Sequence, residues 1–262
     1  MLQKHGVSAA ILDGDAARAL APQATDRVVG GVYFPDDAHL TPDRFVQALA
    51  QRAVEHGARL ETGIDVIGFE TGDKRITGVM TNRGVIRADQ IVLAAGAWSP
   101  QLSRDLDLPL DVQPAKGYSI TVERPEGFPE LPMHLVEGKV VVTPMGETLR
   151  FAGTLELAGL DESVNRRRVE AIRRVVPQYL KVDPYAGLVE IWRGLRPLSP
   201  DTLPVIGRSR RWENLVIATG HGMLGMSLGP ITGQLVADLV TGSPPSLDLT
   251  PFRPDRMERL LA

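Results

Sequence analysis

The sequence predicts a mixed α/β fold, with a partial parallel sheet flanked by helices and a separate β-rich unit. Leu215–Ala218 is a short apolar run closed by glycines, and the Ala88–Ser99 segment contains a similar run that ends in small residues. Such runs are typical of buried parallel strands with a ligand across their carboxyl edge. Between them, residues 112–157 contain short β-branched runs separated by Pro and Gly turns, which predict the β-rich unit.

Elements in the first hundred residues follow from turn and capping signals. Thr41 followed by Pro42 predicts the start of a helix, and the apolar spacing carries this helix to Gly57. Asp13 or Asp15 is expected to cap a shorter helix that runs through Leu20. Strands are expected at Val7–Leu12, Gly30–Pro35 and Arg59–Thr62, and an antiparallel meander at Ile64–Phe69, Arg75–Thr81 and Val85–Arg87.

The β-rich unit is followed by an arginine-rich helix, expected from about Glu162 to Val175. Its arginines at 166, 167, 168, 173 and 174 are expected to point outward and Val164 inward, with Val169, Ile172, Val175 and Val176. The arginines indicate either a solvated helix face or a patch for a membrane surface or a partner. The strands expected around this helix are Tyr118–Glu123, Met133–Val136, Lys139–Thr143, Leu149–Gly153 and Tyr185–Trp192.

A glycine-rich turn, Gly220–Gly225, follows the Leu215–Ala218 strand and precedes a helix that is expected to stop at Gly242. Pro230 is expected in the first turn of this helix, where proline is tolerated. A helix that starts after such a turn aims unpaired backbone N–H groups and its positive dipole end at whatever lies above it. Close packing of helix on strand is the alternative explanation for the glycines.

Composition excludes several classes of function. The 262 residues have a net charge of −3 and include no cysteine, which argues against a nucleic-acid partner and rules out disulfides and thiolate ligands. No run of 18 apolar residues is present, so we expect no transmembrane span. The cytoplasm is the expected compartment, with a peripheral place on the inner face of the membrane as the alternative. No metal site is expected, because the histidines share no ligand spacing: His5, His39, His56, His134 and His221.

Three motifs resemble the FAD-dependent amine and amino-acid oxidoreductases of the D-amino-acid oxidase (DAO) type. They are Gly194-Leu-Arg-Pro197, Gly220-His-Gly-Met-Leu-Gly225 and Ala95-Gly-Ala-Trp-Ser99. Within this family, Pro114-Ala-Lys-Gly-Tyr-Ser119 is most similar to the bacterial D-amino-acid dehydrogenases. The resemblance implies an incomplete FAD-binding Rossmann-like domain at residues 1–110 plus 195–262. It implies an antiparallel-sheet substrate-binding domain at residues 111–194.

The resemblance also implies roles for individual residues. Arg196 would bind a substrate carboxylate, and Lys116 and Tyr118 would line the substrate side. His221 would help to stabilise the negative charge that develops on the flavin during reduction, or would relay a proton. The residues expected to bind FAD are Val66, Ala95, Gly96, Trp98, Gly220, Gly222, Met223, Leu224 and Gly225. From the residues alone, Arg196 is also consistent with a structural ion pair, His221 with a backbone spacer and Trp98 with a packing role.

The front of the chain departs from the family, which begins with a strand, a Gly-x-Gly-x-x-Gly turn and a helix that hold the FAD pyrophosphate. No such turn opens this sequence. We therefore expect a C-terminal fragment of a full enzyme, a chain that pairs with a separate FAD-binding subunit, or a protein that has lost the cofactor. The expected reaction is oxidation of the CH–NH2 or CH–NH group of a D-amino acid or related amine by hydride transfer to flavin, with oxygen and a quinone both open as electron acceptors. The alternative is a non-catalytic amino-acid-binding protein.

Overall fold

β13 (Leu215–Thr219) pairs in parallel with β6 (Ile91–Leu93) in a computed structural model that describes residues 6–259. β12 (Val205–Arg208) pairs with the other edge of β13 in the antiparallel sense, so the strand order is β12-β13-β6. Leu93, Leu215 and Ile217 are buried in the core of this sheet. The two predicted parallel-sheet strands are therefore confirmed, and the structure pairs them with each other.

The described residues form two compact units. Unit 1 contains the residues up to Leu49, Gly117–Glu156 and Glu162–Gly194. Unit 2 contains Ala50–Lys116, Leu157–Asp161 and the residues from Leu195 onward. The predicted domains, residues 1–110 plus 195–262 and residues 111–194, stay a prediction. His5 and the two ends of the first predicted domain lie outside the described residues.

In unit 1, the first three elements form a small structure of their own. β1 (Ala10–Asp13) and β2 (Gly30–Tyr33) are antiparallel, and α1 (Gly14–Leu20) lies between them in the chain. The Asp13 carboxylate caps α1 by accepting a hydrogen bond from the Ala16 amide at 2.8 Å. This confirms the predicted cap.

A five-stranded sheet with the order β11-β7-β10-β9-β8 contains the β-rich segment. The pairs β10/β9 and β9/β8 are antiparallel. Val142, Phe151 and Ile172 belong to one buried core, so α4 (Arg166–Tyr179) covers strands of this sheet with its apolar side. The strands are β7 (Gln113–Glu123), β8 (Met133–Leu135), β9 (Val140–Met145), β10 (Thr148–Glu156) and β11 (Leu188–Leu198). The short ends Gln113–Lys116 and Leu195–Leu198 belong to unit 2.

Two expectations about the α4 region were wrong. The helix begins at Arg166 instead of Glu162, because the Asn165 side chain accepts a hydrogen bond from the Arg167 amide at 3.1 Å and caps the helix there. Val164 consequently precedes the helix and is 45% exposed instead of pointing inward. The strand expected at Tyr185–Trp192 is also displaced towards the C-terminus, since β11 covers Leu188–Leu198.

In unit 2, β3 (Val66–Gly72), β4 (Arg75–Thr81) and β5 (Gly84–Ile86) form the predicted antiparallel meander. The strand expected at Arg59–Thr62 is wrong: within the described residues this stretch has no strand partner, and its residues are exposed. An extended segment needs a partner strand to satisfy its backbone N–H and C=O groups, or it leaves them to water, as this exposed stretch does. The predicted helix before it is confirmed as α2 (Pro42–Glu55), followed by Gly57 at a positive φ of 95°.

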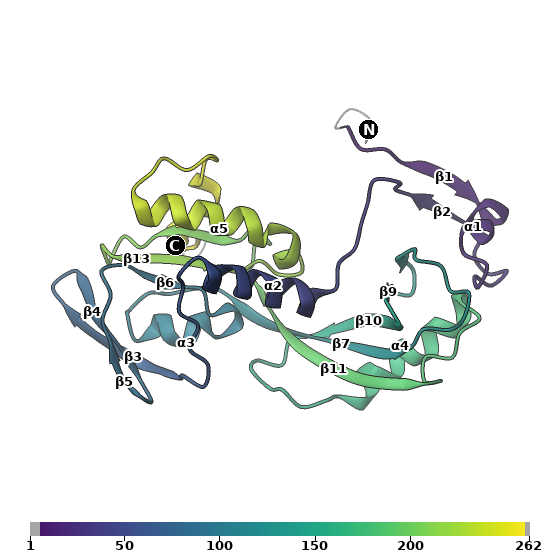
Figure 1. Cartoon of the computed structure of the whole chain (residues 1–262), viewed down its shortest axis with the longest axis horizontal. Coiled ribbons are helices and arrows are strands. Elements are labelled where there is room, and N and C mark those ends of the chain that lie inside the picture. The colour runs from purple at the N-terminus through teal and green to yellow at the C-terminus, as the bar shows by residue number, and fades with distance from the viewer. Residues whose placement is uncertain (1–5, 260–262) are drawn as a thin grey trace. The chain divides into compact units, whose positions relative to one another are not determined.

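α5 (Gly225–Thr241) follows the glycine-rich turn and lies along β13 (Figure 1). Gly242 ends it in the left-handed conformation, with φ of 77°, as predicted. Pro230 does not lie in the first turn, because the Leu228 amide already closes that turn on the Leu224 carbonyl at 2.9 Å. It removes one N–H group from the helix interior instead. Among the described residues, no helix has the length and apolar character that crossing a membrane requires.

Candidate active site

Arg196 lies near the end of β11 in unit 2, and its guanidinium is in an unusual environment. Its Nη1 atom is buried and has no hydrogen-bond partner among residues 6–259. Burial lowers the pKa of Arg196 below its usual value, because a low-dielectric surrounding disfavours the cation. A buried cationic donor without a partner is costly, so this position favours an anionic ligand that accepts from it.

The strand that carries Arg196 is attached to the glycine-rich turn. Leu198 forms an antiparallel bridge with His221, and the Gly222 amide donates to the Pro197 carbonyl at 2.8 Å. Two residues after Arg196, the chain is thus held against the turn that begins α5. The structure thus places the Gly220–Gly225 turn against the strand of Arg196, in line with their assignment to the same family signature.

His221 is fixed by a second contact on α5. Its Nε2 atom lies 2.9 Å from the Thr232 hydroxyl, and Thr232 is buried. Burial lowers the pKa of the His221 imidazole, which favours the neutral ring near pH 7. A neutral imidazole that is held by a hydroxyl can orient the turn or accept a proton, but it does not add a positive charge.

The turn itself requires glycine. Gly220 and Gly222 have φ values of 77° and 55°, which side chains rarely adopt. A Cβ atom at Gly222 would also lie 3.0 Å from Cδ2 of Leu198. Among residues 6–259, no side chain caps the start of α5, so the first N–H groups of this 17-residue helix remain available to an acceptor. Met223 and Leu224 beside them are 73% and 59% exposed.

The second glycine signature lies at the same edge of the parallel sheet. Because β6 and β13 are parallel, the residues that follow them emerge at one edge. The Thr219 hydroxyl donates to the Gly96 carbonyl at 3.0 Å, and the Ser99 hydroxyl lies 3.2 Å from Thr219 Oγ1. Ala95 and Gly96 are thereby joined to Gly220, and Trp98 on the short helix η2 (Gly96–Trp98) is 45% exposed.

The remaining predicted residues lie in other surroundings. Val66 is the first residue of β3 and pairs with Thr81 in the meander sheet of unit 2. Lys116 is completely buried on β7, and its Nζ atom lies 2.6 Å from Asp161 Oδ2. Tyr118, in unit 1, is buried with its hydroxyl bonded to the Glu156 carboxylate. Roles for these residues in binding stay predictions.

Sequence reasoning missed the partners that hold the site. Thr219 and Thr232 fix Gly96 and His221, and the carboxylate of Asp201 forms a two-point pair with Arg256 at 2.8 and 3.0 Å. The sequence could have pointed to Thr219, because it is the polar residue that ends a buried strand directly before Gly220. Asp201 and Arg256 are 55 positions apart, and no local pattern connects them.

These residues fit the ring end of a flavin. An uncapped helix terminus suits partial negative charge on a ring edge, and positive-φ glycines allow close approach of the backbone. Exposed apolar side chains beside the turn suit a flat aromatic body. Within the described residues, no cluster of three or more His, Asp or Glu side chains is arranged to hold a metal ion.

Comparisons with known proteins support this interpretation. A D-amino acid dehydrogenase of Chromohalobacter salexigens is 37% identical over 225 residues, which are 85% of this chain and 54% of that relative. A D-amino-acid oxidase of Bradyrhizobium diazoefficiens is 35% identical over 97% of this chain and 61% of its own length. The crystal structure of glycine oxidase from Geobacillus kaustophilus matches with a TM-score of 0.90 at 27% identity, covering 97% of this chain and 68% of that one.

The chain therefore spans a little over half the length of the first of these curated relatives. The family model for FAD-dependent oxidoreductases of the DAO type matches residues 1–239. This match confirms the resemblance drawn from the three motifs, the fold class and FAD as the cofactor of the family. The chain belongs to the DAO family of FAD-dependent oxidoreductases.

Proposed function

We propose that the chain supplies the substrate-binding part and the flavin-ring-binding part of an oxidoreductase. The substrate would be a D-amino acid or a related amine, and its CH–NH2 or CH–NH group would be oxidised to the imine. The observation that carries this proposal is the buried Arg196 guanidinium, which has an unpartnered Nη1 atom and lies on a strand joined to the Gly220–Gly225 turn. Both D-specific relatives named above support the substrate class.

Arg196 would hold the substrate carboxylate. The planar fork of a guanidinium donates two parallel charge-assisted hydrogen bonds, which fix both the position and the orientation of a carboxylate. Burial strengthens this interaction, because water does not compete for the buried Nη1 atom. Fixing the carboxylate fixes the Cα atom next to it, and orientation of this kind is a large part of catalysis in two-substrate reactions.

The glycine-rich edge would hold the cofactor. FAD, when bound, would supply the two-electron acceptor for the hydride that leaves Cα. The uncapped start of α5 would stabilise the negative charge that develops on reduction, through the backbone of Leu224 and Gly225. Contacts with the ring and its substituents are proposed for Ala95, Gly96, Trp98, Gly220, Gly222 and Met223, and an adenine contact for Val66.

Three further side chains are proposed to act on the substrate side. His221, neutral and held by Thr232, would keep the turn in place and is suited to accept a proton. Lys116, which is paired with Asp161, would contribute a fixed positive charge. Tyr118 would line the substrate side with its hydroxyl, which is held by a hydrogen bond to Glu156. We further propose a cytoplasmic location, which the cysteine-free composition supports, and an electron acceptor that reaches the protein from outside this chain.

A reduction experiment tests the proposal. The chain is joined to the N-terminal segment of the Chromohalobacter relative and loaded with FAD, and the visible flavin band is followed without oxygen. Addition of a D-amino acid should bleach the band, and the L-enantiomer should leave it unchanged. Binding of the D-amino acid without any bleaching would instead support a non-catalytic amino-acid-binding protein.

A further inference from the structure

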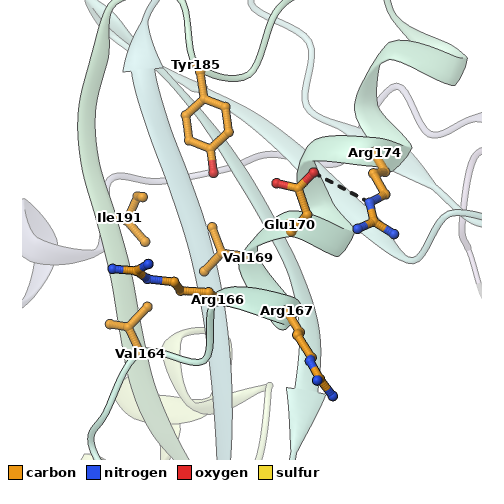
Figure 2. A pocket seen from close by; sticks show the side chains of 8 residues that line it. All are labelled: Val164, Arg166, Arg167, Val169, Glu170, Arg174, Tyr185 and Ile191. Carbon is orange, nitrogen blue, oxygen red and sulfur yellow. Dashed lines mark hydrogen bonds and ion pairs between the residues drawn. The ribbon is translucent and has the colours of Figure 1, made fainter.

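An open hollow in unit 1 is lined by residues that the proposed function does not use (Figure 2). It has a volume of about 770 Å³, which lies within the ~300–1,000 Å³ range of small-molecule sites. One wall is the exposed side of α4, and the others come from the segment before that helix, from Tyr185 and from β11. The lining residues are Val164, Arg166, Arg167, Val169, Glu170, Arg174, Tyr185 and Ile191.

The charge of this hollow is positive and only partly compensated. α4 contains five arginines and one glutamate, so its net charge is +5 − 1 = +4 in a chain with a net charge of −3. The Glu170 carboxylate lies within 3.5 Å of both Arg173 and Arg174 and forms an ion pair with each. Within residues 6–259, the guanidinium groups of Arg166 and Arg167 make no hydrogen bond or ion pair. Two arginines are therefore available to an anion.

The same hollow offers an apolar surface. Val164 and Ile191 are 45% and 38% exposed, and Val169 of α4 lies beside them at the base of the hollow (Figure 2). The hydroxyl of Tyr185 points towards the same space, while the guanidinium of Arg173 lies 5.1 Å from the centre of its ring. The ring is thus held in place, and its hydroxyl has no hydrogen-bond partner among the residues that the structure describes. Apolar side chains next to fixed donors suit a ligand that has an apolar body as well as a charge.

We propose that this hollow binds a small organic anion with an apolar body and a phosphate or carboxylate group. Arg166, whose side chain lies between Val164 and Ile191 in Figure 2, would hold the anionic group, since a guanidinium fork matches both of these groups. Arg167 would add positive charge at the same end of α4. Val164 and Ile191 would cover the apolar body, and the Tyr185 hydroxyl would donate to a polar substituent. A membrane surface fits less well, because Val169, Ile172 and Val176 of α4 are already buried in the core and cannot insert into lipid. This proposal does not depend on the proposed oxidoreductase function.

A titration with 1-naphthyl phosphate tests the site. The whole chain is labelled at isoleucine methyl groups, and the Ile191 signal is assigned from its loss in Ile191→Val. The probe should shift the Ile191 signal and saturate it. Arg166→Gln with Arg167→Gln should weaken the apparent affinity by at least about tenfold, because hydrogen bonds to charged groups are lost. The control, Arg44→Gln with Arg59→Gln, removes two exposed arginines elsewhere and should leave the affinity unchanged.

Three further probes decide which chemistry is recognised. Inorganic phosphate and 1-naphthol should each bind more weakly than the complete probe, because each provides only half of the contacts. Equal weakening by the control pair would show general charge attraction and overturn the proposal. No shift of Ile191 at saturating probe would also overturn it. The proposal would also be overturned if the chain bound phosphatidylserine vesicles tightly, lost that binding in the Arg166/Arg167 variant and did not bind the soluble probe. That result would indicate a membrane surface.

Discussion

Leu198 and His221 face each other as an antiparallel bridge, and this pairing connects the strand of Arg196 to the turn that begins α5. The Gly222 amide strengthens the connection by donating to the Pro197 carbonyl at 2.8 Å. A residue proposed to bind substrate and a turn proposed to bind flavin are thus fixed by the same backbone contacts. Because the two parts share these backbone contacts, a substitution in the turn should alter the position of Arg196.

Gly222→Ala should destabilise the protein and disturb this connection. The φ of 55° costs a residue with a Cβ atom about 1–2 kcal/mol, and the added atom would also lie 3.0 Å from Leu198. Gly159→Ala is the matched control, because Gly159 has a φ of 62° and an added Cβ would have no atom of the described part of the chain within 4 Å. Urea unfolding should show the larger loss for Gly222→Ala. Equal losses would mean that the contact with Leu198 is unimportant.

Asp201→Asn should weaken the loop that follows Arg196. The hydrogen bonds from Arg256 lower the pKa of Asp201, so its contribution to stability is present above the unfolded pKa of about 3.9 and is lost as the pH falls through the lower folded value. We expect the substitution to lower the free energy of unfolding by about 1–3 kcal/mol near pH 7. The free energy of unfolding of the variant should also fall less steeply than that of the wild type as the pH is lowered. Asp107→Asn, which removes an exposed pair with Arg211, should cost under about 1 kcal/mol. A larger loss for Asp107→Asn would contradict the expectation.

His221→Gln should remove part of the pH dependence of folding. Burial lowers the pKa of His221, so the unfolded chain binds its proton more readily than the folded one. The stability contribution is therefore complete above the unfolded pKa of about 6.5 and declines as the pH falls towards the folded value. Unfolding of both proteins at about pH 7.5 and about pH 5.5 measures this effect. An unchanged pH dependence in the variant would show that His221 is not responsible.

The 262-residue chain should bind FAD weakly or not at all. It keeps the residues proposed to meet the flavin ring, and the one Gly-x-Gly-x-x-Gly pattern in these 262 residues, Gly220–Gly225, is among them. A second such turn, which would hold the pyrophosphate, does not occur in this sequence. Loss of a phosphate site at a helix terminus should cost several powers of ten in affinity, since each ~1.4 kcal/mol is tenfold. Stoichiometric FAD that survives gel filtration with this chain would contradict the prediction.

Local signals in the sequence predicted those elements whose ends are set by nearby residues. Asp13, Thr41 with Pro42, and Gly242 each mark a helix end through a short-range effect, and each was identified correctly. The start of α4 was missed because Asn165 caps the helix while Glu162 only resembles a starting residue. The strand expected at Arg59–Thr62 failed because strand formation depends on a partner, which local composition does not reveal.

The candidate site shows the same limit. Arg196 and Gly220–Gly225 were recognised from their motifs, but their connection through Leu198 and His221 depends on how distant strands pair. The partner of Lys116 was also beyond prediction, since Asp161 lies 45 positions away in a loop without a motif. Pairs of this kind arise from the tertiary fold, and a single sequence carries no local trace of them.

Substitution of Arg196 addresses the central claim, which is that its guanidinium binds the substrate carboxylate. Arg196→Ala, in the chain completed with the N-terminal segment of the Chromohalobacter relative, should leave FAD bound and lower kcat/KM for a D-amino acid. Loss of a buried charge-assisted contact typically costs about 2–5 kcal/mol, hence roughly 30-fold to several thousand-fold. Arg196→Lys should restore only part of this, because an ammonium group lacks the fork. Arg193→Ala, on the same strand, is the control and should have little effect.

The most direct measurement compares kcat/KM for a D-amino acid and for the amine formed by its decarboxylation, on wild type and on Arg196→Ala. The amine has no carboxylate, so the substitution should reduce its kcat/KM only slightly. A large loss for the amino acid together with a small loss for the amine is the predicted result. Equal losses for both substrates would show that Arg196 has a structural role and would contradict the account.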